Sequence, residues 1–93
     1  MDEKHEECGV FGVYSHENRN VAYTVYYGLY ALQHRGQESA GIAVAYADKI
    51  AYYKGMGLVP EVFANGALDE LPEGDIAIGH VRYSTTGASQ LLN

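Results

Sequence analysis

One stretch with helical periodicity lies among several short runs of strand character, and this mixture is the strongest constraint on the fold. From Val21 to about His34, apolar residues recur at spacings of three and four, which is typical of one face of an amphipathic helix. These residues are Val21, Val25, Leu29 and Leu32. Gly28 is a tolerated weak point, because glycine costs about 1 kcal/mol in a helix interior. The chain is therefore predicted to have one main helix.

The remaining pattern predicts strands and turns around this helix. Residues 8–14, 41–46, 50–53 and 75–83 are predicted strands, and the first, being apolar with two glycines, is typical of a buried strand. Residues 47–49 are expected to connect a hairpin, and residues 35–39, 55–57, 71–74 and 84–89 to be breaks, turns or loops. Residues 59–71 are expected to contain one or two short helices. The order strand, helix, hairpin, short helices, strand predicts an α+β fold.

Composition excludes several classes of function. The chain has 93 residues, 47% hydrophobic and 19% charged, and its net charge of −6 argues against binding to nucleic acid or an anionic membrane. No apolar run approaches the roughly 18 residues that a membrane span requires. Residues 1–7 are acidic and lack the apolar stretch of a secretory signal, so a cytoplasmic protein is expected. A single cysteine excludes an internal disulfide framework and a cysteine-rich metal site.

That cysteine, Cys8, is followed by Gly9 and is a candidate nucleophile. A lone cysteine is either a buried small hydrophobic residue or a reactive thiol. If residues 1–7 were removed, Cys8 would carry a free α-amine, which titrates near pH 7.7–8.0 and can act as the base for the thiol. The acidic, polar character of residues 1–7 fits a disposable leader, but it fits an ordinary frayed terminus equally well.

Two further polar segments could carry chemistry. Residues 33–41 form a dense polar run, and if this run were buried its hydrogen-bond donors would need partners. The alternative is that the run is a helix C-terminus, where His34 and Arg35 interact favourably with the helix dipole. In residues 79–87, Arg82 is followed by hydroxyl residues and a glycine, which suits binding of a small-molecule carboxylate. The plainer interpretation is that Arg82 pairs with a surface acid. His80 is expected to be a hydrogen-bonded packing residue.

Three segments taken together resemble a known family. They are Cys-Gly-Val-Phe-Gly at 8–12, Leu-Gln-His-Arg-Gly-Gln-Glu-Ser-Ala-Gly-Ile at 32–42 and Gly-His-Val-Arg-Tyr-Ser-Thr at 79–85. In this order and spacing they resemble the glutaminase domain of the amidophosphoribosyltransferase family, within the class II glutamine amidotransferases. Residues 55–63 look like that family's segment between the second and third motifs. The resemblance extends from residue 8 to residue 93, which would be an incomplete class II glutaminase domain.

The resemblance implies a fold and a chemistry. The fold would be of the N-terminal-nucleophile hydrolase type, an αββα sandwich, of which this chain would form the first part. Cys8 would attack the side-chain amide of glutamine and release ammonia, which forms phosphoribosylamine from PRPP in the first step of purine synthesis. Arg82 would bind the glutamine α-carboxylate with help from Thr85, while Arg35 and Gly9 would support the site. A leader cleaved before Cys-Gly occurs in one branch of the family, which favours a propeptide at residues 1–7.

The departures from the family pattern are as informative as the matches. The family's Asn-Gly oxyanion pair and the acidic residue that grips the glutamine amine lie beyond this region, and Asn65-Gly66 is predicted to be only a turn. The transferase domain is also missing, with its Mg²⁺ and the iron–sulfur cluster of one branch, so no cofactor is expected within this chain. The 93 residues alone are expected to be inactive, with unpaired strand edges and an open core. As a full-length protein, the family member would be a homo-oligomer.

A non-enzymatic hypothesis remains open. A truncated paralogue could act as a glutamine-binding or partner-binding module that keeps residues 1–7. A zinc site formed by histidines is not favoured, because the spacings of His5, His16, His34 and His80 match no common ligand pattern.

Overall fold

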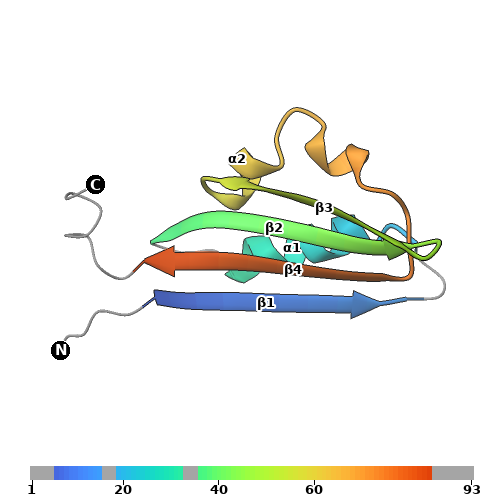
Figure 1. The fold of residues 1–93 in the computed structure, drawn as a ribbon. Coiled ribbons are helices and arrows are strands. Elements are labelled where there is room, and N and C mark those ends of the chain that lie inside the picture. Colours follow the sequence, from blue (N-terminus) through green and yellow to red (C-terminus); the bar gives the residue numbers. More distant parts are fainter. Residues whose placement is uncertain (1–5, 16–18, 33–35, 85–93) are drawn as a thin grey trace.

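The computed structural model describes residues 6–15, 19–32 and 36–84. In chain order the elements are β1 (Glu6–Tyr14), α1 (Val21–Leu32), β2 (Gln37–Tyr46), β3 (Lys49–Met56), α2 (Val59–Val62), the 3₁₀ helix η1 (Ala67–Glu70) and β4 (Ile76–Ser84). This succession confirms the predicted order of strand, helix, hairpin, short helices and strand, and the fold is α+β (Figure 1). No helix in the described ranges is both long enough and apolar enough to cross a membrane.

The strands form one antiparallel sheet in the order β1-β4-β2-β3. β4, the last strand of the chain, lies between β1 and β2 and pairs with both (Figure 1). Cys8 is the register partner of Arg82 near one end of the β1–β4 pair, and Tyr14 is the partner of Ile76 at the other end. We call the first end, with the starts of β1 and β2, the motif end. The opposite end, where β2 turns into β3, is the hairpin end.

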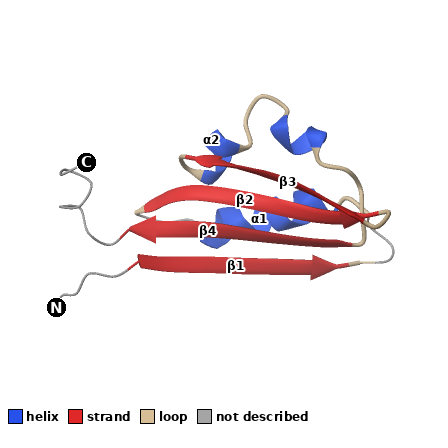
Figure 2. Cartoon of the chain, viewed as in Figure 1, coloured by secondary structure: helices blue, strands red, loops and turns tan. Residues whose placement is uncertain are grey.

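Helix α1 covers one face of the sheet and builds the core with it (Figure 2). The side chains of Val21, Val25 and Leu29 are fully buried on α1. Those of Ile42, Val44 and Val81 are fully buried on the sheet. Burying one such side chain is worth about 1.5–3 kcal/mol relative to leaving it exposed, so the apolar stripe on α1 is what fixes the helix against the strands.

Two glycines allow this close approach of helix and sheet. A Cβ added at Gly79 would lie 2.4 Å from Val25 Cγ1, and one added at Gly28 would lie 2.4 Å from Phe11 Cε2. No side chain can occupy either space without displacing the packed neighbour. Gly28 is therefore more than a tolerated weak point of the helix, because it makes room for an aromatic ring on β1.

The opposite face of the sheet exposes apolar side chains. Val10, Ile50 and Met56 are 69%, 74% and 77% exposed, respectively. The prediction of a buried strand at residues 8–14 is therefore only half right: Phe11 packs against the core, whereas Val10 and Tyr14 face outward. Within the described residues no other element covers this face.

The turns follow the local sequence in two places. Ala47 and Asp48 both have positive φ, 47° and 66°, and form the two-residue turn of the β2–β3 hairpin. Asn65 and Gly66, with φ of 59° and 81°, form a left-handed turn between α2 and η1. The prediction that Asn65-Gly66 is a turn is confirmed.

Strand boundaries differ from the predicted ones at the motif end. β2 begins at Gln37 rather than at Gly41, and β3 runs to Met56 rather than ending at Tyr53. The predicted turn at residues 55–57 is thus wrong for Gly55 and Met56, which pair with β2. The predicted loop at residues 84–89 is wrong for Ser84, the last residue of β4, and its other residues lie outside the described ranges. Pairing with neighbouring strands, which local sequence does not encode, extends each of these strands.

Candidate active site

The motif end brings together the three segments that the sequence singles out. Cys8, Arg82, Ser39 and Met56 are successive register partners across β1, β4, β2 and β3. Neighbouring strands lie about 4.8 Å apart, so the backbones of Cys8 and Arg82 are adjacent although the residues are far apart in sequence. The predicted nucleophile and the predicted carboxylate ligand therefore start from one place on the sheet.

The structure describes the other predicted site residues to different extents. The structure describes Cys8 through its backbone, and Arg35 and Thr85 lie outside the described residues. Gly9 is described: a Cβ added there would lie 3.2 Å from Leu32 Cδ1, tighter than ordinary van der Waals contact. The absence of a side chain at Gly9 therefore lets β1 pack closely against the end of α1, and its role in supporting the site stays a prediction.

Arg82 forms an ion pair with Glu38 from the second segment. The distance between Arg82 Nε and Glu38 Oε2 is 3.5 Å, and the two side chains are 47% and 31% exposed. The plainer interpretation of Arg82, pairing with an acid near the surface, is thus fulfilled. Partly exposed pairs of this kind contribute only about 0–1 kcal/mol to stability, so stability alone gives little reason for this arrangement.

Glu38 occupies a β-bulge. Gln37 pairs with Tyr83 and Ser39 pairs with Arg82, which leaves Glu38 as the extra residue of β2. A bulge of this kind redirects side chains and is frequent beside active sites. Its effect here is to place a carboxylate next to the arginine that the sequence proposes as a ligand.

The buried side chain of Gln37 holds this bulge. Its Nε2 donates to the carbonyl oxygens of Ser39, at 3.0 Å, and Gly57, at 2.8 Å. Its Oε1 accepts from the backbone N–H of Val59 at 3.2 Å. Gln37 is only 6% exposed, and these bonds satisfy both ends of its amide. Within the polar run 33–41, the Gln37 amide thus finds the partners that a buried donor needs, and the β3–α2 connection is tied to β2. Residues 33–35 of this run lie outside the described residues.

A cavity of about 390 Å³ opens beside Arg82 at the motif end. Its described lining includes Lys54 and His80 in addition to Arg82, together with Ser39, Gly55 and Met56. This clustering of basic side chains stands out in a chain whose net charge is −6. Such a lining favours an anionic group in a small-molecule ligand.

His80 is held in this wall by Tyr52. The Tyr52 hydroxyl and His80 Nε2 are hydrogen-bonded at 3.0 Å, and their rings are stacked with centroids 6.2 Å apart. Gly41 lies beneath them: a Cβ added there would be 2.6 Å from His80 Nε2. Burial and then the nearby Lys54 ammonium lower the pKa of His80 below its usual 6.5, so the neutral imidazole is favoured at pH 7. His80 is hydrogen-bonded as predicted.

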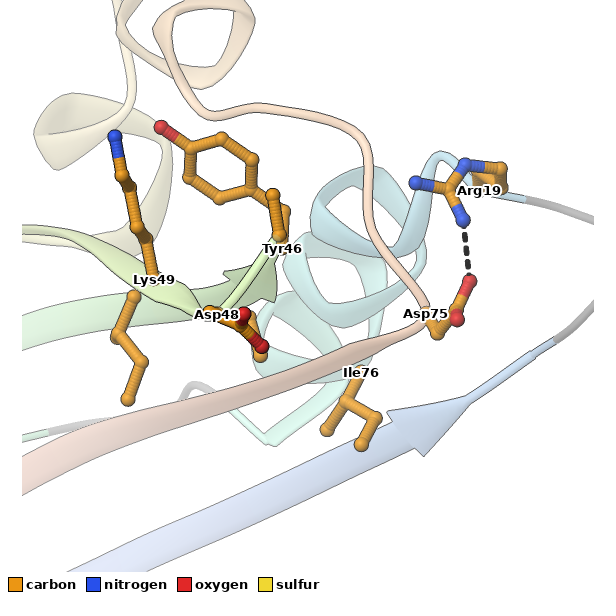
Figure 3. Close-up of a pocket in the computed structure, with 9 residues that line it drawn as sticks. Arg19, Tyr46, Asp48, Lys49, Asp75 and Ile76 are labelled. Atoms are coloured by element: carbon orange, nitrogen blue, oxygen red, sulfur yellow. Dashed lines mark hydrogen bonds and ion pairs between the residues drawn. The ribbon is translucent and has the colours of Figure 1, made fainter.

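A second cavity, of about 430 Å³, lies at the hairpin end (Figure 3). Arg19 and Asp75 form an ion pair there at 2.5 Å, and Asp48 and Lys49 of the hairpin lie across from them (Figure 3). Among the described residues that line it, none belongs to the three sequence segments, and the charges of Arg19 and Lys49 are balanced by those of Asp48 and Asp75. We therefore place the candidate site at the motif end.

The structure describes no metal-binding cluster. Within residues 6–15, 19–32 and 36–84, no group of three or more His, Cys, Asp or Glu residues is arranged to hold a metal ion. Of the histidines considered for zinc, only His80 lies in these ranges, and His5, His16 and His34 lie outside them.

Gln37, Glu38 and the Tyr52–His80 pair are site features that sequence reasoning did not assign. The density of polar residues at 33–41 was a usable signal for Gln37, because a buried amide needs both a donor and an acceptor partner. No local pattern indicates that Glu38 is bulged, since the bulge exists only in the register of β2 against β4.

Comparison with known proteins identifies the family. No protein-family model matches the chain. It is 59% identical over 86 residues to the amidophosphoribosyltransferase of Methanocaldococcus jannaschii, a match that covers 92% of this chain and 18% of that protein. The Synechococcus elongatus amidophosphoribosyltransferase is 53% identical over 92 residues, covering 99% of this chain and 18% of that protein. The chain belongs to the amidophosphoribosyltransferase family.

A solved amidophosphoribosyltransferase structure agrees with this assignment. The glutamine phosphoribosylpyrophosphate amidotransferase from B. subtilis, complexed with ADP and GMP, superimposes with a TM-score of 0.70 and 51% sequence identity. The superposition covers 83% of this chain and 16% of the B. subtilis chain. The sequence resemblance is thereby confirmed, and this chain spans about 18% of the length of the two curated amidophosphoribosyltransferases named above.

Proposed function

We propose that this chain supplies the nucleophile and the carboxylate-binding arginine of a glutaminase site in an amidophosphoribosyltransferase. The observation that carries the proposal is the direct register pairing of Cys8 with Arg82. Adjacent strands are about 4.8 Å apart, and the α-carboxylate and side-chain amide carbons of an extended glutamine are separated by roughly 5 Å, given C–C bonds of about 1.5 Å. The main-chain separation of Cys8 and Arg82 is therefore close to the length of one glutamine, which supports a single ligand shared between them.

In the proposed chemistry residues 1–7 are removed as a leader, so that Cys8 begins the chain. The free α-amine accepts the thiol proton, and Sγ attacks the amide carbon of glutamine. The C–N bond then breaks, the amine returns the proton to the leaving nitrogen, and ammonia departs to leave a thioester. Water hydrolyses the thioester to glutamate and the free thiol. Arg82 holds the α-carboxylate throughout, assisted by Thr85, while Arg35 and Gly9 support Cys8.

The proposal includes the αββα architecture of the N-terminal-nucleophile hydrolases. The apolar open face of the sheet, with Val10, Ile50 and Met56 each more than two-thirds exposed, is suited to packing against a second sheet. That sheet would contribute the oxyanion donors and the acid that binds the glutamine amine. Such a layer would make residues 8–93 one part of a larger glutaminase domain.

The wider activity follows from the family. Ammonia released at Cys8 would be used to make phosphoribosylamine from PRPP, the first step of purine synthesis, in a cytoplasmic homo-oligomer. Mg²⁺ belongs with the PRPP-binding part, and the iron–sulfur cluster of one family branch would likewise lie outside this chain. The described residues group no metal ligands, and neither cofactor takes part in the steps assigned above.

Labelling with a glutamine-like electrophile tests this function directly. The protein expressed from its complete gene and purified from its own cells is treated with diazo-oxo-norleucine, and its intact mass is measured before and after. We expect a mature chain that begins at Cys8, one label on that residue, and protection by excess glutamine. The Cys8→Ser variant should remain unlabelled. A mature chain that still begins at Met1 and resists labelling would rule out the nucleophile.

The alternative is a truncated, non-catalytic paralogue that binds glutamine or a protein partner. One observation favours it: the ion pair with Glu38 accounts for the position of Arg82 without any substrate. The same experiment separates the two functions, because a folded binding module would bind glutamine without being labelled by the electrophile.

A further inference from the structure

Glu38 reaches Arg82 only because β2 is bulged at that residue. Without the extra residue between the pairs Gln37–Tyr83 and Ser39–Arg82, the regular alternation of β2 would send the side chains of neighbouring residues to opposite faces. The 3.5 Å contact between Glu38 Oε2 and Arg82 Nε is therefore a consequence of the bulge. Three strands meet here, and the residue beside Arg82 on the other neighbouring strand is Cys8.

The bulge is held by hydrogen bonds of the buried Gln37 side chain, two of which reach the β3–α2 connection. Gln37 donates to the carbonyls of Ser39 and Gly57 and accepts from the N–H of Val59. The carbonyl of Glu38 itself accepts from the N–H of Gly57 at 2.7 Å. A bulge tied down from the β3–α2 connection cannot slide along β2 without breaking these bonds, so the direction of Glu38 is fixed by buried contacts.

The other basic side chains near Arg82 give a carboxylate at this position a physical role. Lys54 and His80 line the same cavity as Arg82, and the ammonium of Lys54 shares it with the guanidinium of Arg82. Repulsion between two cations favours turning the Arg82 side chain away from the cavity, whereas a fixed carboxylate beside Nε opposes that movement. Contact at Nε also orients the planar guanidinium, whose terminal nitrogens form the fork that suits a carboxylate.

We propose that Glu38 is a positioning residue that orients Arg82 toward the α-carboxylate of glutamine, and that Gln37 fixes Glu38 by clamping the bulge. This inference rests on the proposed function, in which Arg82 binds that carboxylate. Glu38 acts through Arg82 and touches neither the amide nor the thiol. Its removal should therefore affect binding of substrates that carry an α-carboxylate and leave the chemical step unchanged.

The test compares two substrates in the protein expressed from its complete gene. Steady-state hydrolysis is measured with glutamine and with glutamine α-amide, which lacks the carboxylate. Glu38→Gln, which preserves size, should raise KM for glutamine about two- to fivefold with kcat unchanged, as for loss of a partly exposed charge pair. It should leave kcat/KM for the α-amide unchanged, a split that general structural damage would not produce. Glu38→Asp, which keeps the charge, should recover part of the loss.

Matched variants separate this inference from the function on which it rests. Asp75→Asn removes the acid of the Arg19 pair at the opposite end of the sheet and should change neither substrate's kinetics. If Arg82→Lys leaves KM for glutamine unchanged, the proposed function of Arg82 fails. Suppose that Arg82→Lys raises KM for glutamine but Glu38→Gln leaves it unchanged. The positioning role of Glu38 is then wrong, while the proposed function of Arg82 stands. The same conclusion holds if Glu38→Gln lowers KM, because Glu38 would then compete with the substrate for Arg82. Equal losses of kcat with both substrates would likewise overturn the positioning role.

Discussion

The two ends of the sheet look alike in outline and differ in construction. Each has a cavity, of about 390 Å³ at the motif end and about 430 Å³ at the hairpin end, and each has an arginine paired with a carboxylate. The hairpin end has the larger cavity and the shorter ion pair, at 2.5 Å against 3.5 Å. Neither cavity volume nor the presence of an ion pair therefore identifies a functional site in this fold.

What distinguishes the ends is the origin and balance of their charges. At the hairpin end, Arg19 and Lys49 are matched by Asp48 and Asp75. At the motif end the described side chains that line the cavity include basic groups and no acid, and the carboxylate that meets Arg82 comes from a bulge tied down by a buried amide. The motif end therefore contains a β-bulge and a buried side-chain amide, whose burial costs free energy unless it is fully hydrogen-bonded. This is also the end where we expect a ligand to bind.

The largest expected effect is on glutaminase activity, when the arginine at the motif end is replaced and the arginine at the hairpin end serves as the control. Arg82→Gln should lower kcat/KM for glutamine by about thirtyfold or more, because losing one partner of a charge-assisted contact costs roughly 2–5 kcal/mol. Arg19→Gln should leave it unchanged. Initial rates of glutamate formation in the full-gene protein measure both. Similar losses in the two variants would erase the functional distinction between the ends.

Next in size is the loss of the buried clamp. Gln37→Glu keeps the shape but replaces a donor with an anion facing the carbonyls of Ser39 and Gly57, and it should destabilise the protein by about 1–3 kcal/mol. Urea unfolding measures the change, with Gln37→Met as the control that removes the bonds without adding a charge. An unchanged unfolding midpoint in Gln37→Glu would show that the bulge does not need this amide.

A smaller effect is expected from pH at the motif end. Burial and Lys54 lower the pKa of His80, so the folded state binds its proton more weakly than the unfolded state does. The sign follows by linkage: stability is fully present above the unfolded value near 6.5 and declines as pH falls through the lowered folded pKa. Lys54 and Arg82 line the same cavity as His80, and the Tyr52 hydroxyl is hydrogen-bonded to His80 Nε2. The difference in urea midpoint between wild type and His80→Gln should therefore depend on pH between about 8 and 5, and a constant difference would contradict this.

The smallest effect belongs to the hairpin end. Asp75→Asn removes a pair whose side chains are 49% and 45% exposed, and it should change stability by no more than about 1 kcal/mol. Raising the salt concentration should shrink even this difference. A loss comparable to that of Gln37→Glu would mean that the hairpin end is as firmly built as the motif end.

Sequence patterns predicted most of the regular structure because it is local in origin. The spacing of Val21, Val25 and Leu29 places all three on the buried stripe of α1, and the helix begins where that pattern begins. Asn65-Gly66 forms its left-handed turn as predicted, because asparagine and glycine tolerate positive φ. Cys8 and Arg82, which the resemblance assigns to one site, are register partners, although nothing local links the start of one strand to the end of another.

The sequence by itself determined the element order, the face of α1 that is buried and the family, since each depends on residue type and spacing along the chain. Only the tertiary structure decided that β4 lies between β1 and β2, that β2 starts at Gln37, and that Glu38 is bulged toward Arg82. These features depend on strand register, and register is set by packing between segments distant in sequence. The two ends of the sheet therefore differ in their polar contacts because of long-range strand pairing rather than local propensity.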